Sequence, residues 1–169
     1  EVIKLPIGVF GMIAPFNFPG MVPFWFLPYA IASGNTYVVK PSEQVPMTMA
    51  LIAEWIDESG LPAGVFNMVH GTLEASKALV EHPKTEGIVG QSKTVRAVNT
   101  RCSDLGKRCQ GLGGAKNHLV AMPDAHLDQV IRNMTTSCYG CAGQRCMASS
   151  VIVGVGDEMY RKLVDRFVE

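Results

Sequence analysis

Short apolar runs alternate with amphipathic stretches along the chain. The apolar runs are short and bounded by turn residues, which predicts buried strands at 7–14, 37–40, 65–69, 87–89, 119–122 and 151–155. The amphipathic stretches predict helices at 72–81, 92–105, 127–138 and 158–168, and one more helix that begins near Pro46 and stops at Gly60. Residues 21–32 are apolar on nearly every side, which predicts one fully buried helix.

Strands that alternate with helices in this way are typical of an α/β fold. We therefore expect a parallel sheet with helices on both faces, in which ligands bind beyond the carboxyl ends of the strands. Five residues come at or just after predicted strand ends: Asn17, Lys40, Glu43, Gly71 and Gly90. Their convergence predicts a binding site at this edge. The alternatives are an asparagine that satisfies turn backbone and an ordinary solvated lysine–glutamate pair.

Composition limits the classes of function. The chain has 169 residues, 47% of them hydrophobic and 18% charged, which describes a globular domain. Fifteen basic residues balance fifteen acidic ones, so the charge favours neither nucleic acid nor an anionic membrane as a partner. The longest apolar stretch, 13–31, is interrupted by Asn, Pro and Gly and predicts no membrane span. The sequence starts at Glu1 and stops inside a helical pattern, so we expect a fragment.

The five cysteines are an odd number, which favours a reducing compartment, either the cytoplasm or a mitochondrial matrix. Cys146 lies between small residues and next to Arg145, where a thiolate nucleophile is approachable. The alternative is a buried cysteine that only packs. Cys138 and Cys141 form a C-x-x-C pair, which leaves a redox or metal module open, but no second pair and no suitably spaced histidines complete a zinc site.

Other motifs of cofactor enzymes and hydrolases are absent. Residues 111–116 read GLGGAK, with lysine where a G-x-G-x-x-G motif needs its third glycine. No G-x-S-x-G occurs, so the sequence gives no support for a serine hydrolase.

Several segments together resemble the aldehyde dehydrogenase superfamily. They are PFNFP at 15–19, KPSE at 40–43 and GQRC at 143–146, in the family's order and spacing. GAKNH at 114–118 and MPDA at 122–125 are similar to the CoA-acylating methylmalonate-semialdehyde dehydrogenases. The resemblance implies a partial, Rossmann-like NAD-binding domain over 1–139 and the start of the catalytic domain over 140–169. It also implies a homo-oligomeric full-length enzyme with NAD as cofactor, CoA as co-substrate and no metal.

The resemblance also implies roles for individual residues. Cys146 would be the nucleophile, Asn17 and the Cys146 backbone N–H would bind the oxyanion, and Arg145 would hold a substrate carboxylate. Lys40 and Glu43 would bind the adenosine ribose. The remaining cofactor-binding residues would be Ala14, Phe16, Ser42, Gly71, Gly90 and Gln91.

Two departures from the family pattern shape the expected reaction. Hydrolytic members carry a glutamate base in an E-L-G-G-like motif, and the position is Gly111 or Leu112 here, depending on the alignment. Neither side chain accepts a proton, so we expect the acyl group to pass to CoA. The segment before Gly90 is about two residues shorter than in the subfamily, which weakens a pyrophosphate contact by Gln91. The open alternatives are a hydrolytic aldehyde dehydrogenase and an inactive homologue that keeps the fold.

Overall fold

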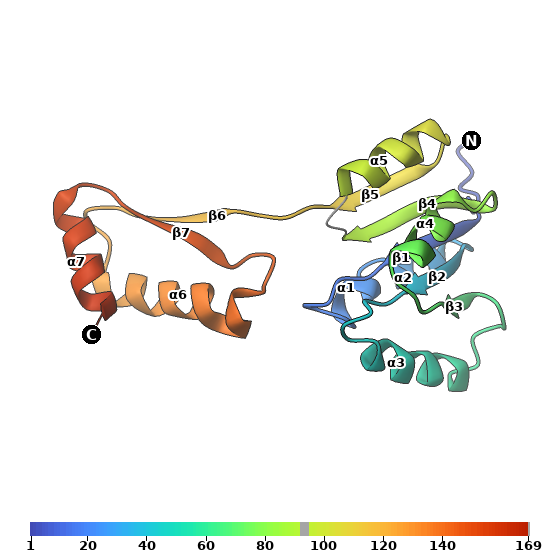
Figure 1. Cartoon of the computed structure of the whole chain (residues 1–169), viewed down its shortest axis with the longest axis horizontal. Coiled ribbons are helices and arrows are strands. Elements are labelled where there is room, and N and C mark those ends of the chain that lie inside the picture. Colours follow the sequence, from blue (N-terminus) through green and yellow to red (C-terminus); the bar gives the residue numbers. More distant parts are fainter. Residues whose placement is uncertain (92–94, 169) are drawn as a thin grey trace. The chain divides into compact units, whose positions relative to one another are not determined.

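The computed structural model describes residues 1–91 and 95–168 and forms two compact units, Glu1–Gly113 and Gly114–Glu169. Figure 1 labels the elements along the chain. The predicted change from a cofactor-binding to a catalytic domain, between residues 139 and 140, falls inside the second unit. That assignment of roles to domains stays a prediction, whereas the break in packing lies between Gly113 and Gly114.

The first unit is built on a five-stranded parallel sheet in the order β3-β2-β1-β4-β5. Its strands are β1 (Val9–Ile13), β2 (Thr36–Lys40), β3 (Phe66–Met68), β4 (Thr85–Gln91) and β5 (Arg108–Leu112). The chain order runs outward from β1 in both directions, so the sheet has its topological switch point between β1 and β4. The expected Rossmann-like α/β sheet is confirmed.

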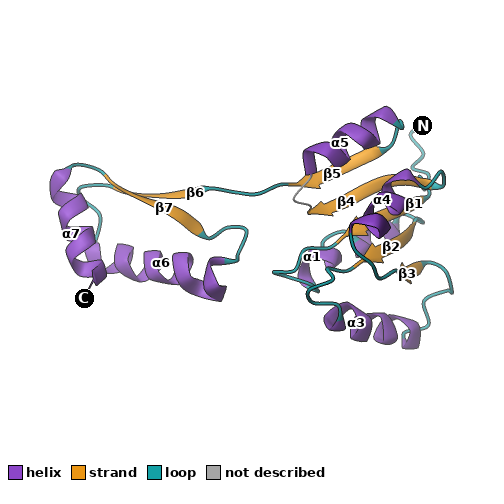
Figure 2. Cartoon of the chain, in the orientation of Figure 1, coloured by secondary structure: helices purple, strands orange, loops and turns teal. Residues whose placement is uncertain are grey.

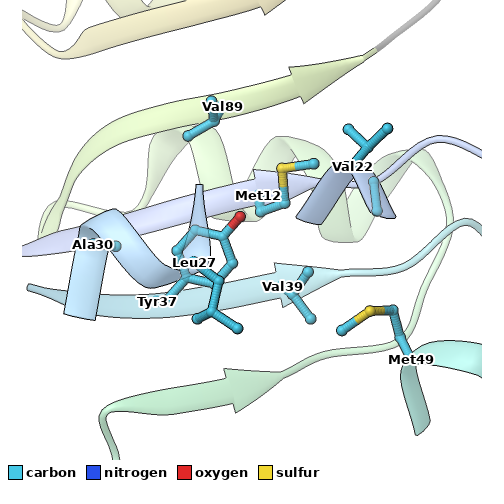
Figure 3. Close-up of a cluster of buried hydrophobic side chains, with 9 residues drawn as sticks. Met12, Val22, Leu27, Ala30, Tyr37, Val39, Met49 and Val89 are labelled. Carbon is cyan, nitrogen blue, oxygen red and sulfur yellow. The ribbon is translucent and has the colours of Figure 1, made fainter. Parts of the chain in front are cut away.

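Neighbouring residues on the central strands point to opposite faces of this sheet. Met12, Val39 and Val89 pack in one buried cluster, which Figure 3 shows with Leu27 and Tyr37. Their neighbours Ile13, Val38 and Ile88 belong to a second cluster. Both faces are apolar because helices cover both: α1 (Met21–Phe24), α2 (Leu27–Ala32) and α3 (Met47–Glu58) pack on the first cluster, and α4 (Leu73–Glu81) and α5 (Val95–Asp104) on the second.

One expectation about this unit was wrong, and one strand was not predicted. The single buried helix over 21–32 is two short helices, and Phe24, Trp25 and Tyr29 are exposed. Pro28 sits in the first turn of α2, where proline starts a helix more readily than it continues one. Strand β5 had no predicted counterpart, because its sequence RCQGL lacks an apolar pattern.

The second unit contains a two-stranded parallel sheet, β6 (Asn117–Ala121) and β7 (Ser149–Gly154). Between these strands come α6 (Leu127–Tyr139) and the short helix η1 (Gly140–Gly143), and α7 (Asp157–Val168) follows (Figure 2). A cluster centred on Ala121, Met159 and Leu163 joins both long helices to the strands. None of the helices in the described part of the chain combines the length and apolar character that a membrane crossing requires.

Candidate active site

The first group of predicted site residues lies at the carboxyl edge of the five-stranded sheet. Ile13 pairs with Lys40 on β2 and with Gly90 on β4, so the ends of these three strands lie side by side. The backbone N–H of Ala14 donates to the carbonyl oxygen of Lys40 at 3.0 Å, which extends the pairing one residue past β1. The predicted residues after β1 and β2 are therefore held on a fixed backbone.

Lys40 is the most strongly fixed polar side chain at this edge. Its side chain is 3% exposed, and Nζ donates to the Pro41 carbonyl at 2.8 Å and to Oε2 of Glu43 at 3.0 Å. The Glu43 side chain is 57% exposed, so the pair presents a buried donor and an accessible acceptor. Half-buried Ser42 accepts the N–H of Val45 at its carbonyl at 3.2 Å, which forms the turn that carries Glu43.

Two glycines at this edge occupy positions where any side chain would be strained. Gly90 has φ +130°, and a Cβ there would lie 2.1 Å from the carbonyl oxygen of Ile13. Gly71, which follows β3 and precedes α4, has φ +149°, and its Cβ would lie 2.5 Å from that of Ala75. Glycine therefore lets β4 approach the β1 backbone at Gly90 and lets the chain pass close to Ala75 of α4 at Gly71.

Asn17 follows β1 through a buried proline, Pro15. Asn17 itself is half-buried with its Oδ1 atom buried, whereas the neighbouring Phe16 is 43% exposed. Prolines at 15 and 19 restrict the backbone on both sides, which explains why this segment turns instead of continuing as a strand or helix. Gln91 ends β4, and its side chain lies outside the described residues.

The second group of predicted residues, Arg145 and Cys146, lies in the other unit on the loop between η1 and β7. Both residues are exposed. The side chain of Asn117, at the start of β6, donates from Nδ2 to the Cys146 carbonyl at 2.8 Å and to the Ala148 carbonyl at 3.1 Å. This loop therefore presents a reachable thiol on a backbone that is held from both sides of Met147.

The helix η1, directly before this loop, has unusual backbone geometry. Cys141, Ala142 and Gly143 have φ values of 55°, 52° and 70°. Two residues with a Cβ in the left-handed region cost roughly 1–3 kcal/mol each, so surrounding contacts must hold them. The chain on either side of them is tied together: the Ser137 hydroxyl, on α6, accepts the backbone N–H of Ser149, at the start of β7, at 3.0 Å.

Sequence reasoning missed the part played by Asn117. Its side chain contacts the Cys146 carbonyl 29 residues further along the chain, and no local pattern predicts such a contact. The remaining cysteines give no metal centre: in the described part of the chain no group of three or more His, Cys, Asp or Glu residues is arranged to hold a metal ion. Cys138 is half-buried and Cys141 is exposed.

The predicted site residues thus fall into two sets. The cofactor-binding set and Asn17 share one sheet edge in the first unit, and Arg145 and Cys146 share one loop in the second. Each set is coherent by itself, and a common active site formed by both is a proposal.

Comparison with known proteins identifies the family. The model of the aldehyde dehydrogenase family matches residues 1–169, the whole chain. The chain belongs to the aldehyde dehydrogenase family. A malonate-semialdehyde dehydrogenase from Geobacillus kaustophilus is 49% identical over 166 residues, which are 95% of this chain and 34% of that protein. One from Pseudomonas aeruginosa is 48% identical over 165 residues, 96% of this chain and 33% of that protein.

The chain also superposes closely on solved structures of this family. A Sinorhizobium meliloti protein assigned as a methylmalonate-semialdehyde dehydrogenase, in complex with NAD, superposes with a TM-score of 0.95 at 45% identity. The superposition covers 98% of this chain and 34% of that one. The methylmalonate-semialdehyde dehydrogenase of Oceanimonas doudoroffii gives 0.92 at 44% identity, covering 96% of this chain and 34% of that one. The chain spans about a third of the length of these relatives.

Proposed function

We propose that the full-length protein containing this chain is an NAD-dependent semialdehyde dehydrogenase that forms a thioester on Cys146 and passes the acyl group to CoA. The observation that carries the proposal is the exposed Cys146 on a loop whose backbone Asn117 holds at 2.8 Å and 3.1 Å. An exposed thiol on a fixed loop suits a nucleophile better than a packing role, because a structural cysteine is usually buried.

Cys146 attacks the aldehyde carbon, and negative charge develops on the aldehyde oxygen. The side-chain amide of Asn17 and the backbone N–H of Cys146 donate to that oxygen and stabilise it. Asn17 suits this task because the prolines around it fix its position after β1. The proposal requires the two units to meet in the full-length protein so that both donors face one substrate.

The carboxyl edge of the sheet fits a dinucleotide. Lys40 offers a fixed donor and Glu43 an accessible acceptor, which together match the hydroxyl groups of a ribose. Gly90 keeps β4 close to β1 where these strands end, and Gly71 passes close to Ala75. Ala14 and Phe16 follow β1, Ser42 follows β2, and Gln91 ends β4. NAD, named with the Sinorhizobium meliloti structure, would supply the hydride acceptor when bound there.

The substrate is proposed to be malonate or methylmalonate semialdehyde, the compounds in the names of the relatives. Both carry a carboxylate, and the exposed Arg145 next to the nucleophile is a planar donor that can bind it through two parallel hydrogen bonds. Loss of CO2 from such a substrate leads to acetyl-CoA or propionyl-CoA as the product.

Transfer to CoA follows from the side chains available for the second half of the reaction. Attack of water on the thioester needs a positioned base. Gly111 and Leu112, the two candidate positions for that base, lie on β5 and have no ionisable group. A thiol ionises far more readily than water, so CoA can accept the acyl group without a carboxylate base.

Product analysis tests the proposal on the full-length protein. Malonate or methylmalonate semialdehyde is turned over with NAD, with and without CoA, and the acyl product is identified. We expect acyl-CoA as the product and slow release of free acid when CoA is omitted. Free acid released equally fast in both cases would show a hydrolytic enzyme, and an absence of NADH in both would show a homologue that has lost activity.

A further inference from the structure

We infer that Gly140 is a positioning residue for Arg145, because the face of the guanidinium packs over Gly140 and an added Cβ would lie only 3.0 Å from it. This inference rests on the proposed function, in which Arg145 binds the substrate carboxylate. Gly140 is the residue at which α6 ends, five positions before Arg145 in the chain.

The distances around Gly140 show how the guanidinium lies. A Cβ built on Gly140 would lie 3.0 Å from Cζ of Arg145, 3.0 Å from Nη1 and 3.2 Å from Nη2. An atom that approached the edge of the group would lie clearly closer to the two nitrogens than to the carbon. The near-equal distances therefore mean that the added carbon would point at the flat face of the guanidinium.

Packing through the face preserves the binding function of the group. All five N–H donors of a guanidinium lie in its plane, so a group that lies flat on the backbone keeps its donor edge directed along the surface. The carbonyl end of a helix also attracts a cation, and α6 ends at Gly140. Gly140 thus holds the arginine in an orientation from which a carboxylate can be bound through two hydrogen bonds.

The backbone at Gly140 does not itself require glycine. Its φ of −54° and ψ of 132° lie in a region open to every L-residue. The contact with Arg145 is what an added methyl group would meet at Gly140, so Gly140→Ala should fold and move the guanidinium. The end of α6 next to Gly140 is held against α7, because Tyr139 stacks on Phe167 with ring centres 5.8 Å apart.

The test compares two three-carbon aldehydes on the full-length enzyme, malonate semialdehyde and the uncharged propanal. In Gly140→Ala we expect KM for malonate semialdehyde to rise on the order of tenfold, since the added carbon, 3.0 Å from the guanidinium, must displace it from the orientation in which it binds the carboxylate. Kinetics with propanal should stay unchanged. Gly114→Ala adds the same methyl group to the same unit where nothing lies within 4 Å, and it is the matched control.

A double-mutant cycle shows whether Gly140 acts through Arg145. In an Arg145→Met background the added Gly140→Ala change should have no further effect on malonate semialdehyde. A neutral Gly140→Ala, an equal loss on both aldehydes, or a full effect in the Arg145→Met background would each overturn the inference. The proposed function fails separately, through Arg145→Met itself, if that variant keeps the preference for the carboxylated aldehyde.

Discussion

The side-chain amide of Asn117 holds the backbone of Cys146, with Nδ2 of Asn117 donating to the Cys146 carbonyl at 2.8 Å. The same nitrogen donates to the Ala148 carbonyl at 3.1 Å, so one side chain spans three residues of the loop. The pairing of β6 with β7 is irregular at this point, between Asn117 and His118. The amide therefore replaces regular strand pairing where the loop enters β7.

Removing this amide should loosen the loop. In Asn117→Ala we expect the free energy of unfolding of the full-length protein to fall by about 1–2 kcal/mol, the size of two partly exposed hydrogen bonds. The rate at which iodoacetamide alkylates Cys146 should also differ from that of the wild type, because the loop is no longer held in one conformation. Asn133→Ala, at an exposed position on α6, is the control and should leave both quantities unchanged. Identical alkylation rates in both variants would contradict the role of Asn117.

Gly90 should tolerate no side chain. In Gly90→Ala the new Cβ would meet the Ile13 carbonyl oxygen at 2.1 Å with φ at +130°, so β1 and β4 must separate at their carboxyl ends. We expect a loss of at least about 2 kcal/mol in unfolding free energy and weaker NAD binding by calorimetry. Gly113→Ala, whose Cβ would lie at an ordinary 3.6 Å from Val95, is the matched control. Equal stability of the two variants would contradict this account.

The regular parts of the fold were predictable from local patterns. Strands β1, β2 and β4 are buried on both faces of the sheet, and a strand buried on both faces has a continuous apolar sequence that can be recognised directly. Strand β5 has no such run, because Gly111 and polar residues interrupt it. The division of 21–32 into two helices could not be predicted, because a stretch that is apolar throughout shows no periodicity from which helix ends can be located.

The candidate site was predictable only in part. Local sequence and resemblance selected the exposed Cys146, and they selected the pair formed by Lys40 and Glu43. The contacts of Asn117 with Cys146 join residues 29 apart in the chain, and no local pattern reports such a contact. The contact between Gly140 and Arg145 has no local signal either, because it depends on where the Arg145 side chain packs.

The buried thiol of Cys102 should make stability depend on alkaline pH. Burial raises the pKa of Cys102 from 9.0 to about 11, and the neighbouring Cys109 makes a smaller contribution in the same direction. Between these values the unfolded chain loses the proton while the folded protein keeps it, so stability falls as pH rises. In Cys102→Ala this fall should be shallower by at most about 1.4 kcal/mol per pH unit. Denaturant unfolding from pH 8 to 11 checks it, and Cys141→Ala, at an exposed thiol, should behave like the wild type.

The carboxylate of Glu43 should set the preference for NAD over NADP. A phosphate on the ribose 2′ position would bring like charge beside Glu43, which is 57% exposed, and the buried ammonium of Lys40 offsets only part of that repulsion. Glu43→Gln should narrow the NAD/NADP ratio of kcat/KM about fivefold, since an exposed charge contributes roughly 1 kcal/mol. Glu54→Gln, at an exposed position on α3, is the control. Equal efficiency of the wild type with both cofactors would refute the role of Glu43.

Cys146 should be indispensable for turnover and dispensable for cofactor binding. It lies in the second unit, whereas Lys40, Glu43 and the glycines of the sheet edge lie in the first, so Cys146→Ala removes the nucleophile without touching the groups proposed to hold NAD. In the full-length enzyme we expect aldehyde-dependent NADH formation below about a hundredth of the wild-type rate, with NAD affinity by calorimetry nearly unchanged.

The neighbouring thiols provide the control for that experiment. Cys141→Ala removes an exposed cysteine in η1, directly before the Cys146 loop, and Cys138→Ala removes the half-buried one on α6. Both variants should keep their turnover, because neither thiol has a proposed role in forming the thioester. If Cys146→Ala stays active while Cys141→Ala loses activity, the nucleophile has been assigned to the wrong cysteine. If both single variants keep full activity, the reaction does not pass through a thiol of this loop, and covalent catalysis at Cys146 is refuted.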